Sequence, residues 1–274
     1  MSFDEKNILP DDKKTHLDRI FLGVHRQVSS RSGIEFCGVV TGYDGQVIES
    51  SQFPASIGSE CTIVSRYGTL SKGEIIGFKD DKNLIFQYEK TSEIFNGDKI
   101  IASGGLKKID VGPNLLGRVI DGLGSPLDGL GPINTTEQNP IGGQSINPFE
   151  RGEINHTFDV GIKSINAITS IGRGQRIGII AGSGVGKSVL LSMITRSAEA
   201  DVIVVGLIGE RGRELASFTK EITTSHSKHK VVIVAVPADR SALLRIQGAK
   251  RATSIAEYFS DQGKNVLLIL DSLT

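Results

Sequence analysis

Four apolar segments rich in β-branched residues recur in the second half of the chain, at residues 175–181, 201–208, 230–236 and 265–270. Nearly continuous apolar runs of this length are typical of strands that are buried on both faces of a sheet. The stretches between them are long enough for helical crossovers, which join parallel strands with a right-handed turn. The sequence from residue 151 onward therefore predicts an α/β unit built on a parallel sheet.

The preceding part of the chain has a different texture. Between residues 33 and 105, short apolar stretches alternate with turn residues such as Asp44-Gly45 and Asn96-Gly97. Several short strands at regular spacing predict a small all-β barrel or sandwich, which we place at residues 31–108. Residues 109–150 are rich in Gly, Pro, Asn and Thr, so we expect an irregular connector there.

The N-terminal segment predicts a helix. Residues 14–30 place Leu17, Ile20, Phe21, Val24 and Val28 at helical spacing. Such a helix could pack on its own domain or dock onto a partner, and the sequence leaves both interpretations open. The chain also stops directly after the last apolar segment, with no closing helix, so we expect it to be part of a longer protein.

Composition limits the possible environments and partners. The chain has 274 residues, and its 31 basic side chains balance 31 acidic ones, which argues against a bulk electrostatic grip on nucleic acid or on an acidic membrane. The N-terminus lacks the apolar core of a signal peptide. The run VLLIL, at residues 266–270, is too short to span a bilayer. These features favour a cytoplasmic protein.

The stretch IIAGSGVGKSVL, at residues 179–190, is typical of a phosphate-binding loop. Glycines allow backbone N–H groups to converge on phosphate at a helix N-terminus. We expect Lys187 to reach the outer phosphates and Ser188 to place its hydroxyl on Mg²⁺. The complete expected nucleotide-binding set is Gly182, Ser183, Gly184, Val185, Gly186, Lys187, Ser188 and Val189.

One residue of this loop departs from the strict pattern, because Ala181 stands where glycine is usual. We expect a small residue to suffice there, with Gly182 beside it free to adopt an unusual backbone angle. A dinucleotide fingerprint would instead need glycine or alanine at position 187, where this chain has lysine. A purely structural glycine turn is the remaining alternative.

Hydrolysis also requires a group that orients or deprotonates water. Glu210 follows the second apolar segment and Asp271 follows the fourth. Open α/β sheets place their ligands at the carboxyl ends of strands, so both carboxylates are expected beside the loop. We interpret Glu210 as the residue that faces the γ-phosphate and Asp271 as a holder of Mg²⁺ through water.

Taken together, the motifs of this chain resemble those of the ATPase of type III protein export. That family serves the bacterial flagellum and the virulence injectisome, and it is related to the catalytic subunit of rotary ATP synthases. The resemblance also covers the β-rich region and so spans most of the chain. Its motifs are VGPNLLGRVIDGLGSPLDG (111–129), GRGQRIGIIAGSGVGKS (172–188), VVGLIGERGREL (204–215), PADRSALLRIQGAKRATSIAEYF (237–259) and DQGKNVLLILDSLT (261–274).

The resemblance implies a β-barrel, a RecA-like P-loop ATPase core and a C-terminal helical domain, of which the chain is expected to hold the first and part of the second. It implies ATP and Mg²⁺ as cofactors. By similarity Lys187 has its catalytic phosphate-binding role, Glu210 matches the catalytic glutamate, and Asp271 matches the magnesium-linked aspartate. Arg211 would support the glutamate.

The resemblance also implies partners. Family members form homohexamers with nucleotide at subunit interfaces, where a neighbour supplies an arginine finger; that arginine and the adenine pocket would lie beyond Thr274. Residues 1–30 resemble the segment that docks a stator-like regulatory protein and the membrane export gate. A central stalk protein and export chaperones with their substrates are further expected partners, at the cytoplasmic face of the inner membrane. No nucleic acid is expected.

Several alternatives stay open. The motifs favour the flagellar over the injectisome branch, but do not separate the two. A rotary synthase subunit is a second possibility, although the catalytic one typically has threonine where Gly212 stands. An RNA-translocating hexameric helicase would need basic grooves with stacking aromatics, whereas the aromatics of the β-rich region are scattered among acidic residues. In a non-hydrolysing nucleotide sensor, Glu210 and Asp271 would have no role.

Overall fold

The computed structural model describes residues 36–89, 93–102, 107–143, 147–182 and 184–273. The chain divides into two compact units, which we treat separately. The first comprises residues 1–87 and 91–105, and the second comprises residues 88–90 and 106–274. The helix expected at residues 14–30 lies outside the described residues.

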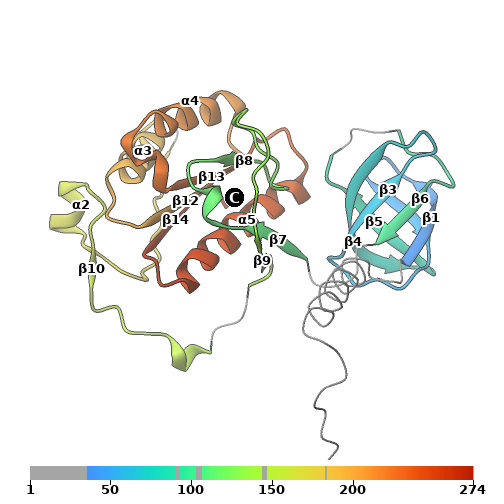
Figure 1. Ribbon diagram of the computed structural model, residues 1–274, viewed down its shortest axis with the longest axis horizontal. Helices are drawn as coiled ribbons and strands as arrows, with labels where there is room; N and C mark the ends of the chain where they lie inside the picture. Colours follow the sequence, from blue (N-terminus) through green and yellow to red (C-terminus); the bar gives the residue numbers. More distant parts are fainter. Residues whose placement is uncertain (1–35, 90–92, 103–106, 144–146, 183, 274) are drawn as a thin grey trace, which may run out of the picture. The chain divides into compact units, whose positions relative to one another are not determined.

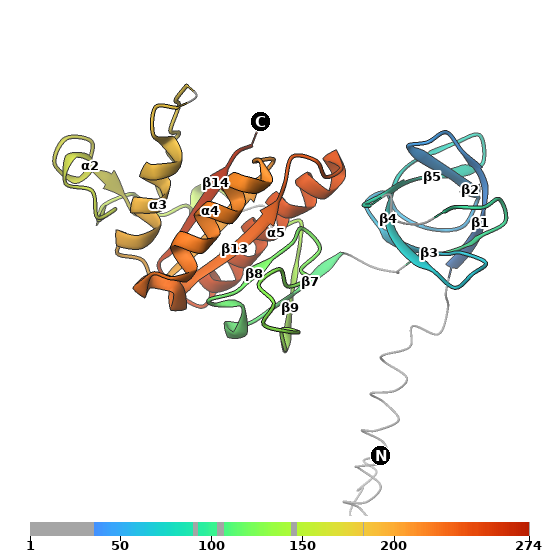
Figure 2. The same ribbon diagram turned by 90° about the horizontal axis from the view of Figure 1, so that it is seen from above.

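The first unit is a closed antiparallel barrel, as the sequence predicted (Figure 2). Its strands pair around the ring in the order β1-β2-β5-β4-β3-β6. Alternate residues point inward, and the interior is filled by aliphatic side chains such as Ile48, Ile63, Ile75 and Ile85, each almost fully buried. The strands are β1 (Phe36–Tyr43), β2 (Val47–Ser51), β3 (Glu60–Val64), β4 (Leu70–Lys79), β5 (Lys82–Gln87) and β6 (Lys99–Ala102).

The second unit is built on a parallel sheet with the strand order β14-β12-β13-β8. Every residue of β12 and β13 is buried, as expected for central strands covered on both faces. The strands are β8 (Val119–Ile120), β12 (Val202–Ile208), β13 (Val231–Val236) and β14 (Val266–Asp271).

Helices cover both faces of this sheet (Figure 1). The helices α3 (Lys187–Ser197) and α4 (Gly212–Thr223) pack with Ile203, Val205 and Leu207 on one face. The long helix α5 (Ala242–Asp261) packs with Val202 and Val204 on the other. Alternating β12 residues therefore serve opposite layers, which confirms the predicted mixed α/β architecture.

Shorter elements fill the remaining described parts of the second unit. Two residues of the stretch expected to be irregular form β8 in the main sheet, and a separate two-stranded sheet joins β7 to β9. These elements are β7 (Lys108–Val111), η1 (Pro113–Leu115), β9 (Glu137–Pro140), η2 (Pro148–Glu150), β10 (Thr157–Phe158), α2 (Lys163–Ile168), β11 (Ile171–Gly172) and η3 (His226–Lys230).

One predicted strand is wrong. Residues 175–181 are not a strand of the sheet, and the fourth position is held by β8. Ile180 is fully exposed and Ile177 is half exposed. A strand is stable only where a neighbour completes its backbone hydrogen bonds, and this segment has no strand partner among the described residues. Apolar, β-branched composition alone did not suffice.

Close contact between α5 and the sheet depends on Gly248. A Cβ built on this glycine would lie 2.5 Å from Val236 Cγ2 and 3.0 Å from Ile208 Cδ1. Alanine normally stabilises a helix interior by roughly 0.5–1 kcal/mol relative to glycine. Overpacking a tight interior contact costs about 1–3 kcal/mol. We therefore expect Gly248→Ala to lower the free energy of unfolding, measured by chemical denaturation.

The matched control is Gly212→Ala at the start of α4, where an added Cβ meets nothing within 4 Å. This variant should be neutral or slightly stabilising. If Gly248→Ala were as stable as Gly212→Ala, the tight contact between α5 and β13 would be contradicted.

Candidate functional site

The glycine-rich loop leads directly into α3. Gly184 and Gly186, the latter at the N-cap of α3, have φ values of 80° and 99°, in the left-handed region that glycine adopts at little cost. An added Cβ at either residue would meet nothing within 4 Å, so backbone conformation rather than space requires glycine. The unusual angle was expected at Gly182, which is not among the residues with positive φ.

Lys187, the first residue of α3, meets two carboxylates. Its Nζ donates to Asp271 Oδ1 at 2.5 Å and lies 3.7 Å from Glu210 Oε1. Asp271 ends β14, and Glu210 follows β12 after Gly209. The two strands pair in parallel, with Leu207 opposite Asp271, so both acids emerge at the same edge. The structure thus brings together the three residues expected to carry the chemistry.

Backbone hydrogen bonds hold the two carboxylates in place. Ser272 N–H donates to the carbonyl of Ile208, which ties the end of β14 to the end of β12. Ala238 N–H donates to the carbonyl of Glu210, which ties it to the chain after β13. The positions of Glu210 and Asp271 are therefore set by the ends of three neighbouring strands.

The environment shifts the pKa values of this cluster. Burial, followed by the nearby Asp271 carboxylate, raises the pKa of Glu210, and the Lys187 ammonium opposes this shift. The hydrogen bond to Asp271 raises the pKa of Lys187 above its ordinary value. A glutamate with a raised pKa is better suited to accept a proton near neutral pH.

A cavity of about 710 Å³ surrounds these groups, within the size range of ligand sites. It lies between the glycine-rich loop and one side of α4, and it contains Lys187, Ser188, Glu210 and Asp271. Ser188 offers a hydroxyl and Asp271 a carboxylate, the oxygen ligands that Mg²⁺ prefers. A glycine-lined helix N-terminus, an ammonium and oxygen ligands fit a nucleotide phosphate chain with its metal.

The other predicted residues have different surroundings. The same cavity is lined by Gly182, Gly184, Gly186 and Val189. Val185 is exposed and is not part of this lining, and Ser183 lies outside the described residues. Arg211 also lines the cavity, but its guanidinium is mostly exposed and pairs with Glu214 at 3.8 Å. Its expected support of Glu210 stays a prediction.

Sequence reasoning missed Arg245, in the first turns of α5. A Cβ built on Gly209, which precedes Glu210, would lie 3.7 Å from Arg245 Cδ. The Nε of Arg245 is buried and has no hydrogen-bond partner among the residues that the structure describes. The available signal was an arginine between the apolar residues Leu244 and Ile246, which is too common to single it out.

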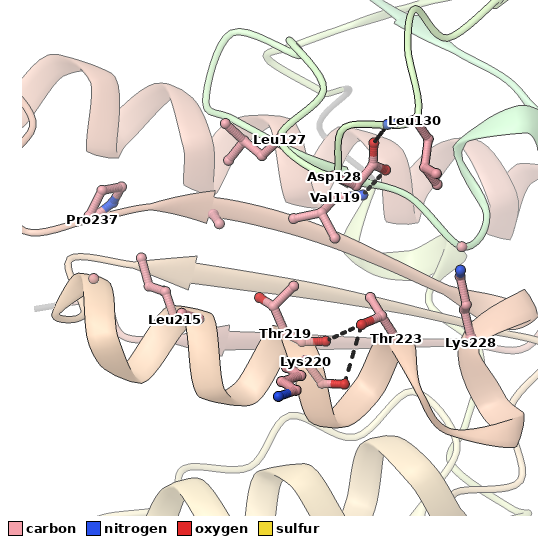
Figure 3. Close-up of a pocket in the computed structure, with 14 residues that line it drawn as sticks. Val119, Leu127, Asp128, Leu130, Leu215, Thr219, Lys220, Thr223, Lys228 and Pro237 are labelled. Carbon is pink, nitrogen blue, oxygen red and sulfur yellow. Dashed lines mark hydrogen bonds between the residues drawn. The ribbon is translucent and has the colours of Figure 1, made fainter.

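A second cavity, of about 600 Å³, lies along the other side of α4 (Figure 3). Asp128 is the only acidic residue in its lining. Both carboxylate oxygens of Asp128 accept hydrogen bonds, from Arg118 and from the backbone of Val119 and Leu130. These bonds, led by that from Arg118, hold the pKa of Asp128 well below its usual range. The Asp128 carboxylate therefore has a structural role, and the cavity around Lys187 is the candidate site for phosphate chemistry.

Comparison with known proteins agrees with this geometry. Residues 161–274 match the nucleotide-binding domain of the ATP synthase alpha/beta family. The flagellum-specific ATP synthase of Salmonella typhimurium is 44% identical over 247 residues, which cover 86% of this chain and 54% of that protein. That of Pseudomonas aeruginosa is 43% identical over 233 residues, covering 84% and 52%. The chain thus spans about half the length of these relatives.

A solved structure is similar across the same region. The ATPase EscN, assembled with its central stalk EscO in the type III secretion system of enteropathogenic Escherichia coli, has a TM-score of 0.79 and 38% identity. The match covers 86% of this chain and 57% of that one. The chain is therefore similar to the flagellum-specific ATP synthases and to a type III secretion ATPase, and residues 161–274 match the nucleotide-binding domain of the ATP synthase alpha/beta family.

Proposed function

We propose that this chain is part of a Mg²⁺-dependent ATPase that energises type III protein export, in the flagellar branch. The convergence of Lys187, Glu210 and Asp271 at one sheet edge carries the proposal, because it supplies a phosphate-binding cation, a base and a metal ligand together. The relatives that match at 43–44% identity are flagellum-specific proteins, which supports the flagellar branch.

Each residue of the proposed site has a separate role in hydrolysis. Lys187 binds the outer phosphates, and the backbone N–H groups of the loop orient them. Glu210 orients the attacking water and holds its proton at the carboxylate, for which its raised pKa is favourable. Ser188 and Asp271 would hold Mg²⁺, which neutralises charge on the phosphate oxygens when bound. Arg211 would support Glu210 once its contact with Glu214 is exchanged.

We further propose the assembly that the relatives suggest. The solved EscN structure is an assembled ATPase with a central stalk, which supports a homohexamer and a stalk protein as partners. A stator-like regulatory protein, export-gate proteins and chaperone-bound substrates complete the proposed set, at the cytoplasmic face of the inner membrane. Within the described residues, no helix is both long and apolar enough to cross a bilayer.

The injectisome branch is the second candidate, because EscN matches 86% of this chain with a TM-score of 0.79. Domain exchange separates the two branches. A chimera in which this chain replaces the matching half of the Salmonella flagellar protein should restore motility, whereas the same exchange into EscN should restore secretion poorly. The reverse pattern would place the chain in the injectisome branch.

Nucleotide binding provides a direct test of the loop. Lys187→Ala should weaken binding of Mg–ADP to the chain by about 10–100-fold, since hydrogen bonds to charged groups contribute about 1.5–3 kcal/mol. Titration calorimetry would measure the dissociation constant. The control is Lys220→Ala, an exposed lysine on α4 in the second cavity, which should bind as wild type. Retained affinity in Lys187→Ala would contradict the assigned phosphate site.

Turnover provides a test of the base. In the motile chimera, Glu210→Gln should retain nucleotide binding and lose roughly 10²–10⁴-fold in kcat, the usual weight of a general base. Glu214→Gln removes an equal charge from the same cavity and should keep most of the activity. Unchanged turnover in Glu210→Gln would remove Glu210 from the mechanism.

A further inference from the structure

The cation of the phosphate site is already engaged by the acid expected to hold the metal. Lys187 Nζ lies 2.5 Å from Asp271 Oδ1, and the Asp271 side chain is only 7% exposed. A lysine directed at an open cavity would leave its ammonium free for phosphate. Here the ammonium is turned toward the end of β14.

The two partners differ in how easily they can move. Asp271 is held by the pairing of β14 with β12 and by the hydrogen bond from Ser272 N–H to the Ile208 carbonyl. Lys187 sits on a flexible four-carbon stem with 29% of its side chain exposed, beside glycines in the left-handed region. Any exchange of partners therefore occurs by movement of Lys187.

Moving the Lys187 ammonium away from Asp271 has an electrostatic cost when no metal is present. If Lys187 turned to a phosphate chain, Asp271 and Glu210 would both lose their nearest cation in a partly buried site. The cavity lining carries the cations Lys187, Arg211 and Arg213 and the acids Glu210, Glu214, Glu221 and Asp271, of which Glu221 pairs with Arg196 at 3.1 Å. Arg211 pairs with Glu214, so it does not replace Lys187 beside Asp271.

We propose that Asp271 is a specificity-determining residue: by holding Lys187 until a divalent cation takes its place, it makes the site select the magnesium complex of a nucleotide over the metal-free nucleotide. This inference rests on the proposed nucleotide site and assigns Asp271 a role beyond metal binding. With the metal complex, Asp271 gains a cation as Lys187 moves to phosphate. With metal-free nucleotide, the Asp271 carboxylate is left unpaired beside Glu210, and both acids repel the incoming phosphate.

The test compares binding of ADP with excess EDTA and binding of Mg–ADP, by titration calorimetry on the full chain. Wild type should bind Mg–ADP more tightly than metal-free ADP. Asp271→Asn, which keeps the shape of the side chain, should strengthen metal-free ADP binding by about tenfold or more, since it removes a charge-assisted bond that competes with phosphate. The ratio of the two dissociation constants should fall correspondingly.

We call the proposed hold of Asp271 on Lys187 the latch. Two further variants separate the latch from a general effect of removing negative charge from the cavity. Glu210→Gln removes the more distant carboxylate, 3.7 Å from Lys187, and should strengthen metal-free ADP binding less than Asp271→Asn does. Glu214→Gln removes an acid that contacts Arg211 and Glu210 but makes no ion pair with Lys187, and it should change metal-free binding little. Thermal melts of all three variants establish that each is folded.

The outcomes are distinct. If Asp271→Asn weakens Mg–ADP binding and leaves metal-free ADP binding unchanged, Asp271 is only a metal ligand and the latch is wrong. If Glu214→Gln strengthens metal-free ADP binding as much as Asp271→Asn does, the effect comes from the general charge of the cavity and the latch is again wrong. If neither the folded chain nor the motile chimera binds either form, the nucleotide site itself is overturned, and the latch with it.

Discussion

The parallel pairing of β12 with β14 is the constraint on which the site depends. It aligns Leu207 with Asp271, so that the chain continuing to Glu210 and the carboxylate ending β14 emerge together. The pairing of β12 with β13 then fixes Glu210 from the other side, through its carbonyl and Ala238 N–H. Asp271 is the last residue of β14 and Glu210 lies two residues beyond the end of the buried strand β12, so the sheet positions both acids.

The glycine-rich loop leads to the cation of the site, Lys187. Its left-handed glycines start α3, which is anchored by Leu191 and Ile194 in the core on one sheet face. This places the Lys187 ammonium opposite two carboxylates that cannot move far. The proposed exchange of a carboxylate for a phosphate requires this combination of a fixed acidic edge with a long, flexible lysine side chain.

Sequence reasoning could anticipate much of this arrangement. The apolar runs at residues 201–208, 230–236 and 265–270 predicted the buried strands, and the rule that parallel strands end at one edge predicted that Glu210 and Asp271 would meet. It failed at residues 175–181, because composition does not reveal whether a strand has a neighbour. The two-residue strand β8 was too short to detect by any pattern.

Individual side-chain contacts were harder to predict than the location of the site. The roles of Lys187 toward phosphate and of Arg211 toward Glu210 stay predictions, and the contacts of Lys187 with Asp271 and of Arg211 with Glu214 were not anticipated. Arg245 approaches Gly209 from α5, a proximity that only the packing of that helix on the sheet creates. Such contacts depend on torsion angles and packing, which sequence spacing does not encode.

A high-resolution structure of the chain with bound Mg–ADP would show directly whether Lys187 changes partner. We expect the phosphates to lie on residues 184–188, Lys187 Nζ to have left Asp271 for a phosphate oxygen, and the metal to lie between Ser188 and Asp271. Nucleotide bound elsewhere, or a Lys187 that still contacts Asp271 while phosphate occupies the loop, would contradict this expectation.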